Sequence, residues 1–419
     1  MSLPAIKDIE EIIFPDPEKI MLPNGIPAYI FSGAPNDILR IDLVFDCGRW
    51  TEKAQQVAHA TASLFKSGTA DLTSFRLNEK IDFYGSTIKA VTGFNTLTLS
   101  LYCMNRVLEP SLEWMLVCLE KIIFPEPELA IFRKNALARL RVSREKNDYL
   151  SDVAFRKIIF GEQHPYGYET TEQALENLQR EQLLDYYSSQ LRTDNASIFI
   201  SGKADGDVIR QVEKTLGQWN PQRKKPVFTP HSVTSSTQKQ LHITKENSVQ
   251  SSIVIGKVLF NKTHADYARF ILLNTIFGGY FGSRLMSNIR EEKGLTYGIH
   301  SGLSTLKFSG SWAIYTDTNI KTLDVCLREI YYELERLHTE RIPDDEIRLA
   351  RNYILGKYLG RTDGPFNRME TFKSYMIEGV PISTFQQFVE DIKSADALSL
   401  QRLAGEYLSK DSLYEVVAG

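Results

Sequence analysis

The sequence lacks most of the features that would assign a chain to a class at once. It contains only four cysteines in 419 residues, scattered without C-x-x-C spacing: Cys47, Cys103, Cys118 and Cys326. We therefore expect buried free thiols, and no disulfide framework or cysteine-based metal site. Apolar runs such as Ile253–Phe260 are far too short to span a membrane, so no membrane span is predicted.

An excess of charge of either sign is also missing. Lys and Arg number 49 against 52 Asp and Glu, a net charge of -3, which argues against a nucleic-acid-binding surface. The start, MSLPAIKDIEE, has no basic stretch followed by an apolar one, so no secretion signal is visible and a cytoplasmic location is expected. A periplasmic location stays open should the natural chain begin earlier.

The composition that is present indicates a globular, multidomain protein. With 42% hydrophobic and 24% charged residues the chain reads as soluble and folded. Its length exceeds what one ordinary core accommodates, so two or more domains are expected. Alternating patterns predict strands at Gly25–Phe31, Leu39–Gly48 and Thr96–Cys103, and helical patterns cover residues 53–66, Leu108–Lys121 and the stretch from Glu126 past Arg144.

The same order of patterns occurs twice. GSTIKAVTGFNTLTLS from Gly85 aligns with GLTYGIHSGLSTLKFS from Gly294, a shift of 294 − 85 = 209 residues. FPEPELAIFRKNALARL from Phe124 likewise matches IPDDEIRLARNYILGKY from Ile342, a shift of 342 − 124 = 218 residues. A strand ending in glycine closes each half, at Gly202 and Gly419. The repetition predicts a duplicated α+β domain.

The segment between the two copies has the composition of a linker. NPQRKKPVFTPHSVTSSTQKQ, residues 220–240, is rich in Pro, Ser, Thr and charge. We therefore expect an N-terminal domain over residues 1–219, a linker over 220–240 and a C-terminal domain over 241–419.

These halves, with HATAS in the first and SRLMSNIREEKGLTYGIHS in the second, resemble the pitrilysin/insulinase family of zinc peptidases. The resemblance runs through nearly the whole chain and includes LPNGIPAYIF and HPYGYETTEQALENLQREQLLDYY. The two-domain length is most similar to the bacterial and mitochondrial-processing branch, whose members work as dimers. The resemblance implies two homologous α/β sandwich domains that face each other as a clamshell around a substrate chamber.

The zinc motif of this family is altered in the sequence. The family carries H-x-x-E-H on a helix, with two His ligands four residues apart and a Glu that activates the zinc-bound water. Aligned on Gly68–Thr69, only His59 is kept, while Ala62 replaces the base and Ser63 the second ligand. A third ligand, a Glu, corresponds to Arg139. Three protein ligands are needed for a catalytic zinc, so we expect no metal, with His59 as a polar or core histidine or as a lone remnant of the metal site.

The second half keeps the residues that the family uses to hold substrate. An Arg and a Tyr seven residues apart correspond to Arg290 and Tyr297 in REEKGLTY. A guanidinium binds a peptide carbonyl, and a phenol can donate to the developing oxyanion. A surface Arg and a half-buried Tyr would show the same spacing.

Two further segments match parts of the family that lie near the substrate. Gly278, Gly279 and Gly282 in FGGYFGSRL correspond to a glycine-containing loop, or to a plain turn. Thr92–Leu97 corresponds to an edge strand that pairs with peptide, or to an internal strand.

The resemblance implies a zinc-less subunit of a heterodimeric metallopeptidase. Its C-terminal half would complete the active site of a zinc-bearing partner acting on peptides, and the chain itself would bind no cofactor and cleave nothing alone. A structural scaffold, like the core subunits of the respiratory cytochrome bc1 complex, and a peptide-binding clamshell without cleavage are the alternatives. The substrate and the identity of the partner do not follow from the sequence.

Overall fold

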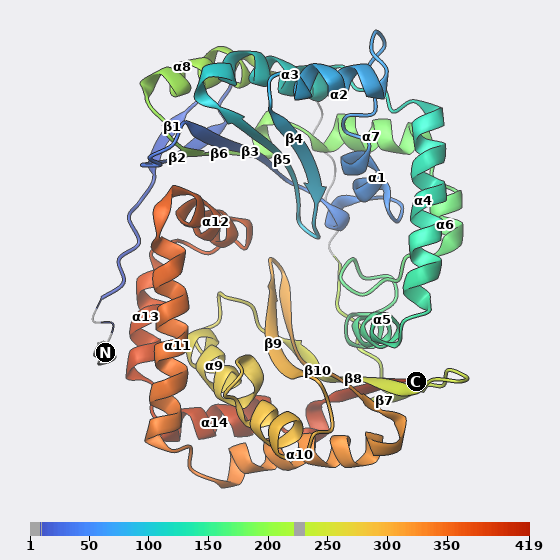
Figure 1. The fold of residues 1–419 in the computed structure, drawn as a ribbon, viewed down its shortest axis with the longest axis vertical. Helices are drawn as coiled ribbons and strands as arrows, with labels where there is room; N and C mark the ends of the chain where they lie inside the picture. The colour runs from blue at the N-terminus through green and yellow to red at the C-terminus, as the bar shows by residue number, and fades with distance from the viewer. Residues whose placement is uncertain (1–8, 10, 222–230) are drawn as a thin grey trace, which may run out of the picture.

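The computed structural model describes residue 9, residues 11–221 and residues 231–419. They form two mixed β-sheets, each flanked by helices (Figure 1). The first sheet has the strand order β1-β2-β6-β3-β5-β4 and the second has the order β7-β11-β8-β10-β9. The strands of the first sheet are β1 (Glu18–Met21), β2 (Pro27–Ser32), β3 (Ile38–Asp46), β4 (Thr87–Thr92), β5 (Thr96–Met104) and β6 (Ala196–Gly202). Those of the second are β7 (Gln240–Ile243), β8 (Gln250–Leu259), β9 (Ile299–Leu306), β10 (Ser309–Asn319) and β11 (Tyr414–Ala418).

The two sheets repeat one topology, which confirms the predicted duplication. The parallel pair β2–β6 corresponds to the parallel pair β7–β11, and the next three antiparallel pairings match one for one. Gly85 and Gly294 occupy the same left-handed conformation, with φ of 65° and 62°. Gly202 and Gly419 end equivalent strands, and a Cβ on Gly202 would lie 2.0 Å from the Ile38 carbonyl oxygen.

Helices connect the strands in a matching order. Those of the first half are α1 (Val57–Ser63), α2 (Ser74–Asp82), α3 (Leu108–Glu120), α4 (Glu126–Arg144), α5 (Asn147–Phe160), α6 (Glu172–Glu176), α7 (Arg180–Gln190) and α8 (Gly206–Lys214). Those of the second are α9 (Tyr267–Asn274), α10 (Leu323–Thr339), α11 (Asp344–Thr362), α12 (Gly364–Ile377), α13 (Thr384–Ser394) and α14 (Ala397–Tyr407), with π-helical turns η5 (Thr275–Gly279) and η6 (Met286–Glu292). Both α4 and α11 have 19 residues, follow a proline and carry acidic residues in the first turn, where they offset the helix dipole. None of the described helices is long and apolar enough to cross a membrane.

Each half contributes one helix to the sheet of the other. Helix α5 of the first half packs on the second sheet, where Phe155 joins a buried cluster with Val254 and Val416. Helix α12 of the second half packs on the first sheet through Met369 and Phe372. Figure 1 shows both helices between the two sheets. The halves are therefore interlocked and face each other, as the clamshell arrangement requires.

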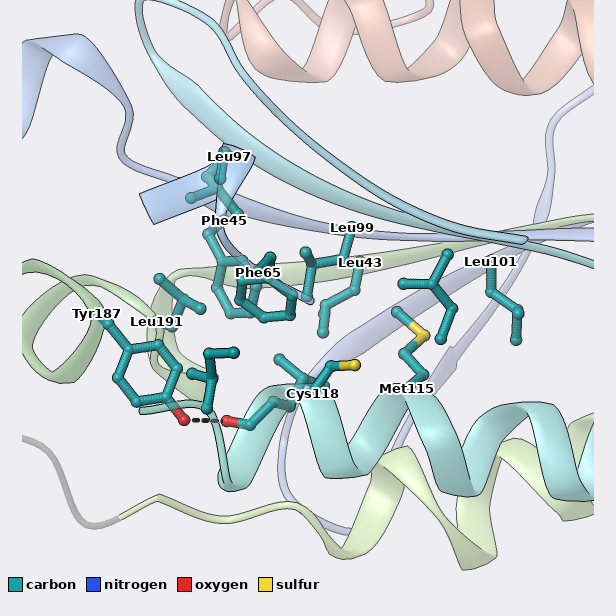
Figure 2. Packing of buried hydrophobic residues seen from close by; sticks show 14 of the residues in the cluster. Leu43, Phe45, Phe65, Leu97, Leu99, Leu101, Met115, Cys118, Tyr187 and Leu191 are labelled. Atoms are coloured by element: carbon teal, nitrogen blue, oxygen red, sulfur yellow. Dashed lines mark hydrogen bonds between the residues drawn. The ribbon is translucent and has the colours of Figure 1, made fainter. Parts of the chain in front are cut away.

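The core of the first half lies between its sheet and the helices α3 and α7. Leucines from β3 and β5 pack on Met115 and Cys118 of α3, and the Tyr187 hydroxyl of α7 donates to the Leu119 carbonyl (Figure 2). All four cysteines are free and buried, as predicted from their spacing. Burial raises the pKa of the Cys118 thiol to about 12, so the thiol stays protonated at neutral pH.

Of the predicted linker, residues 222–230 lie outside the described residues. The part that follows runs along the end of α5, with Thr234 N donating to the Phe160 carbonyl at 3.1 Å and Ser236 N to the Ile158 carbonyl at 2.7 Å. Residues 232–240 are mostly exposed.

Candidate functional site

Helix α1 carries the remnant of the zinc motif. The helix is shorter than the predicted span of residues 53–66, because Gln56 adopts a left-handed conformation with φ of 71° and Val57 is the first helical residue. One face of α1 is buried in the first core, including Ala62, which is 4% exposed. His59 and Ser63 lie on the exposed face, four residues apart and therefore on the same side of the helix.

His59 lies near side chains at the start of α1 and on α4. Its Nδ1 lies 3.1 Å from Gln56 Oε1, and its ring makes an edge contact with Phe132 of α4 at 5.6 Å between centroids. Desolvation of the ring and, second, the positive charge of Arg139 lower the His59 pKa. The Arg139 charge is thus close enough to act on the His59 imidazole, and the assignment of both residues to lost zinc-ligand positions stays a prediction.

This set of side chains does not fit a zinc ion. One imidazole, a methyl group, a hydroxyl and a guanidinium replace three ligands and a base, and a guanidinium stays charged and repels a cation. Across residues 11–221 and 231–419, no cluster of three or more His, Cys, Asp or Glu side chains is arranged to hold a metal.

Sequence reasoning missed a polar network that holds the start of α1. The Tyr168 hydroxyl donates to Glu52 Oε1, and Glu52 Oε2 accepts from Ala58 N at 3.0 Å, which caps the helix. The guanidinium of Arg49 stacks on the Tyr168 ring at 3.3 Å and donates to the Tyr168 carbonyl at 2.5 Å. Burial raises the Glu52 pKa. The network borders a cavity of about 370 Å³ beside His59. In the sequence, the polar residues of GRWTE directly after a strand could have indicated this network.

The segment Thr92–Leu97 was predicted to belong to either an edge strand or an internal strand. It contains the end of one strand, a turn and the start of the next strand. Thr92 ends β4, the next residues form a turn, and Thr96 and Leu97 begin β5. Strand β5 is internal, because it pairs with both β3 and β4, whereas β4 lies at one edge of the first sheet and β1 at the other.

In the second half, the predicted glycine loop packs tightly against β9. Asn274, at the end of α9, donates through Nδ2 to the Ser301 carbonyl at 3.1 Å. Its Oδ1 accepts from Ser301 Oγ at 2.8 Å and from Trp312 Nε1 at 2.7 Å. A Cβ on Gly278 would lie 2.5 Å from Ser301 Oγ, which leaves space only for glycine. The role of Asn274 as the anchor of this loop was not foreseen.

Gly279 and Gly282 are less constrained than Gly278. A Cβ on Gly279 would approach Asn274 Nδ2 at 3.2 Å, and one on Gly282 would meet the Tyr280 ring at 2.9 Å. The loop therefore contains one glycine that the packing requires and two at which a neighbouring side chain would have to move.

Arg290 lies in η6 (Met286–Glu292), and Tyr297 lies in the turn that leads from η6 into β9. Arg290, in η6, stacks over the Phe281 ring at 5.0 Å and makes no ion pair within the part of the chain that the structure describes. Tyr297 is 94% exposed. The backbone on both sides of Tyr297 is fixed, because Leu295 N donates to the Ile289 carbonyl at 2.9 Å and Gly298 N to Thr296 Oγ1 at 3.1 Å. A rigid turn thus presents an aromatic side chain to solvent.

Comparison with known proteins agrees with this architecture. The domain described as "Peptidase M16 inactive domain" matches residues 177–354. An "Uncharacterized zinc protease" from Rickettsia felis is 23% identical over 389 residues, which cover 90% of this chain and 92% of that protein. Residues 177–354 therefore match a domain of the peptidase M16 family, and the likeness to a protein named as a zinc protease extends over 90% of the chain. A "Non-peptidase homolog YmxG" from Helicobacter pylori is 21% identical over 348 residues, 80% of this chain and 78% of that protein.

Solved structures of other proteins share the whole fold. The "peptidase M16 inactive domain" from Pseudomonas fluorescens superposes with a TM-score of 0.85 at 20% identity, covering 96% of this chain and 98% of that one. A chain of complex III from Candida albicans superposes with a TM-score of 0.76 at 15% identity, covering 96% and 95%. Zinc proteases, a non-peptidase homologue and a respiratory complex therefore occur among the similar proteins, and the site residues must decide between them.

Proposed function

We propose that this chain is the zinc-less subunit of a heterodimeric M16 metallopeptidase. It contributes Arg290 and Tyr297 to a peptide held beside the zinc of a partner subunit, and it cleaves no peptide alone. The observation that carries this proposal is the contrast between the two halves. The zinc positions on α1 and α4 are replaced, whereas Tyr297 projects from an anchored turn and is 94% exposed.

The chemistry of the pair suits the stabilisation of a peptide in the transition state. A guanidinium without a carboxylate partner can donate two hydrogen bonds to a peptide carbonyl. A phenol can donate one to the oxyanion that forms when water attacks that carbonyl. The attacking water and the metal would both belong to the partner, because Ala62 and Ser63 cannot activate water as a carboxylate does.

Exposure of Tyr297 in the isolated chain fits a residue that is buried only on assembly or on binding of a peptide. Large aromatic side chains are costly to leave fully in water and are enriched at interfaces and binding sites. The glycine loop and Asn274 give this region a rigid base on β9, so the pair is positioned before the peptide arrives.

The test mixes variant chains with the zinc-bearing partner and measures kcat/KM for a peptide. Arg290→Ala and Tyr297→Phe should each lower kcat/KM by about 10²–10³, the usual effect of losing one oxyanion donor. Arg348→Ala and Tyr332→Phe, which change exposed residues of the same types on α11 and α10, should have no effect. Unchanged activity in both site variants, with the dimer intact, would rule out the shared site.

A structural scaffold is the second candidate, favoured by the likeness to the complex III chain. A scaffold would need neither Arg290 nor Tyr297, and the site variants would then leave both assembly and activity of the complex unchanged. The same measurement therefore separates the two functions.

A further inference from the structure

A cavity of about 750 Å³ lies between β9, the glycine loop and the helices α11 and α12. We propose that this cavity binds a carboxylate of a peptide that lies along β9. The inference rests on the proposed function in that it takes the ligand to be a peptide. It adds a preference for acidic peptides that neither the zinc motif nor the Arg290–Tyr297 pair would provide.

Two cationic side chains in the cavity wall are available to bind an anion. Lys357 and Arg361 lie one turn apart on the exposed side of α11. The Lys357 ammonium is held over the Tyr353 ring at 5.3 Å, and the Arg361 guanidinium over the Tyr358 ring at 4.4 Å. Neither forms an ion pair with any carboxylate of the described residues. The tyrosines orient the two cations without neutralising them.

The other charges that line the cavity are already balanced. Lys262 lies 2.5 Å from Glu378 and 3.0 Å from Ser374 Oγ. Glu370 is held by Arg40 of β3 at 2.5 Å and by Lys373 at 2.8 Å. The cavity therefore retains two uncompensated positive charges, although the chain as a whole has a net charge of -3. A guanidinium next to an ammonium suits a carboxylate, which can accept a bidentate pair from Arg and a third bond from Lys.

The position of β9 links the cavity to a peptide. Strand β9 is the last strand of the second sheet, and Ser301, Leu303 and Thr305, alternate residues on one face, line the cavity. A peptide paired with the outer side of β9 would direct every second side chain to that same face. Figure 1 shows β9 between the two halves, next to α12 and α9.

The opposite face of β9 carries the opposite charge. A second cavity, of about 560 Å³, is lined there by His300 and by side chains of α5 and β10. It contains three carboxylates and one ammonium: Asp148, Asp152, Asp317 and Lys146. Of these, Asp152 is paired with Arg156 of α5 at 3.0 Å, so a negative charge remains. An acidic side chain would be repelled on this face and attracted on the other, so the two cavities together would fix which face of the peptide carries the acid.

The experiment measures peptide binding to the isolated full-length chain by fluorescence anisotropy with a neutral dye. The probes are a short peptide with one central Glu and an amidated end, its Gln counterpart, and the Gln counterpart with a free terminal carboxylate. At least one carboxylate-bearing probe should bind about tenfold more tightly than the neutral peptide, the effect of one added charge-assisted contact. Tighter binding of the Glu probe identifies a side chain as the ligand, and tighter binding of the free acid identifies the chain end.

The double variant Lys357→Gln with Arg361→Gln should abolish this preference and leave binding of the neutral peptide unchanged. Lys80→Gln with Lys121→Gln, two exposed lysines of the first half, makes the same change in net charge and should keep the preference. Equal affinity of the native chain for all three probes would overturn the proposal. So would equal losses in the two double variants, since a general charge effect would then explain the preference. Because no partner is present, this outcome is independent of whether Arg290 and Tyr297 act in the assembled peptidase.

Discussion

The ammonium of Lys373 on α12 lies 2.5 Å from the carboxylate of Asp42 on β3, and this buried pair joins the two halves of the chain. Asp42 is fully buried and also accepts from the Arg40 guanidinium at 2.8 Å and 3.0 Å. The pair sits beside Phe372, which packs on the first sheet. Helix α12 of the second half is thus held on the first sheet by both apolar contacts and a buried ion pair.

Replacing Asp42 by Asn should destabilise the protein by about 3 kcal/mol, because it leaves the buried Lys373 ammonium without its closest carboxylate. The cost stays at the lower end for such pairs, since Glu370 remains 2.8 Å away. Chemical denaturation followed by circular dichroism measures the change. Asp37→Asn, which breaks an exposed pair with Lys203, should cost less than about 1 kcal/mol. Similar costs for both variants would contradict a structural role for the buried pair.

A second contact between the halves lies at the tip of the β9–β10 hairpin. Lys307 is 2.6 Å from both carboxylate oxygens of Asp46, and the Phe308 ring lies 4.4 Å from that of Trp50. Phe308→Ser should free the tip and raise amide hydrogen exchange of the hairpin about tenfold, as local opening becomes easier. Phe83→Ser, an exposed Phe on the first half, should leave that exchange unchanged. An unchanged hairpin in Phe308→Ser would show that the ring does not hold the tip.

Stability should depend on pH through His164. Its Nδ1 accepts from Tyr166 N at 3.1 Å, and burial lowers its pKa to about 4, with the charge of His231 as the second cause. In the unfolded chain the pKa is about 6.5, so between these values the unfolded state binds more protons. The contribution is complete above pH 6.5 and is lost as the pH falls towards 4.

The size of this effect is on the order of 2 kcal/mol between pH 7 and pH 4. Denaturation of the native chain and of His164→Gln across this range measures it, because the variant lacks the titrating group and should show a flatter curve. Parallel curves for the two proteins would exclude His164 as the cause.

The repeated fold could be predicted because the two halves of the sequence keep equivalent residues at corresponding positions. Gly85 and Gly294 need the same left-handed backbone, and the strand ends at Gly202 and Gly419 need the same close approach, so the repeat survives where side chains have diverged. For the same kind of reason, a continuous apolar period, the helix predicted over Leu108–Lys121 was placed to within about one residue. The helix predicted from Glu126 past Arg144 begins at Glu126 and ends at Arg144.

The packing of α5 on the second sheet and of α12 on the first sheet could not be predicted in this way. An amphipathic pattern shows that one face of a helix is buried, but not which sheet covers it. The sequence left open whether Thr92–Leu97 belongs to an edge or an internal strand, because Thr87–Thr92 alternates weakly and the more regular pattern belongs to the internal strand β5. In the site, the lost zinc ligands are visible as residue types, whereas the cavity with Lys357 and Arg361 exists only once β9, α11 and α12 meet.

The isolated chain should bind no stoichiometric zinc and cleave no peptide, because three of the four positions of the zinc motif carry Ala62, Ser63 and Arg139. Elemental analysis of the purified protein and a chelator-controlled peptidase assay check this directly. About one tightly bound zinc per chain, or chelator-sensitive cleavage, would contradict the proposed division of labour.

A variant that restores the zinc ligands tests whether α1 and α4 still have the arrangement that a zinc site requires. Ser63 lies on the same exposed face of α1 as His59, and the Arg139 charge already acts on that imidazole. Ser63→His combined with Arg139→Glu would complete two imidazoles and one carboxylate, a set that holds catalytic zinc. We expect this double variant to bind about one zinc per chain and to remain inactive, since Ala62 still leaves it without a base. Ser63→His combined with Lys134→Glu, which puts the carboxylate at another exposed position of α4, should not retain the metal. If neither double variant binds zinc, α1 and α4 no longer stand in the arrangement that the zinc motif requires.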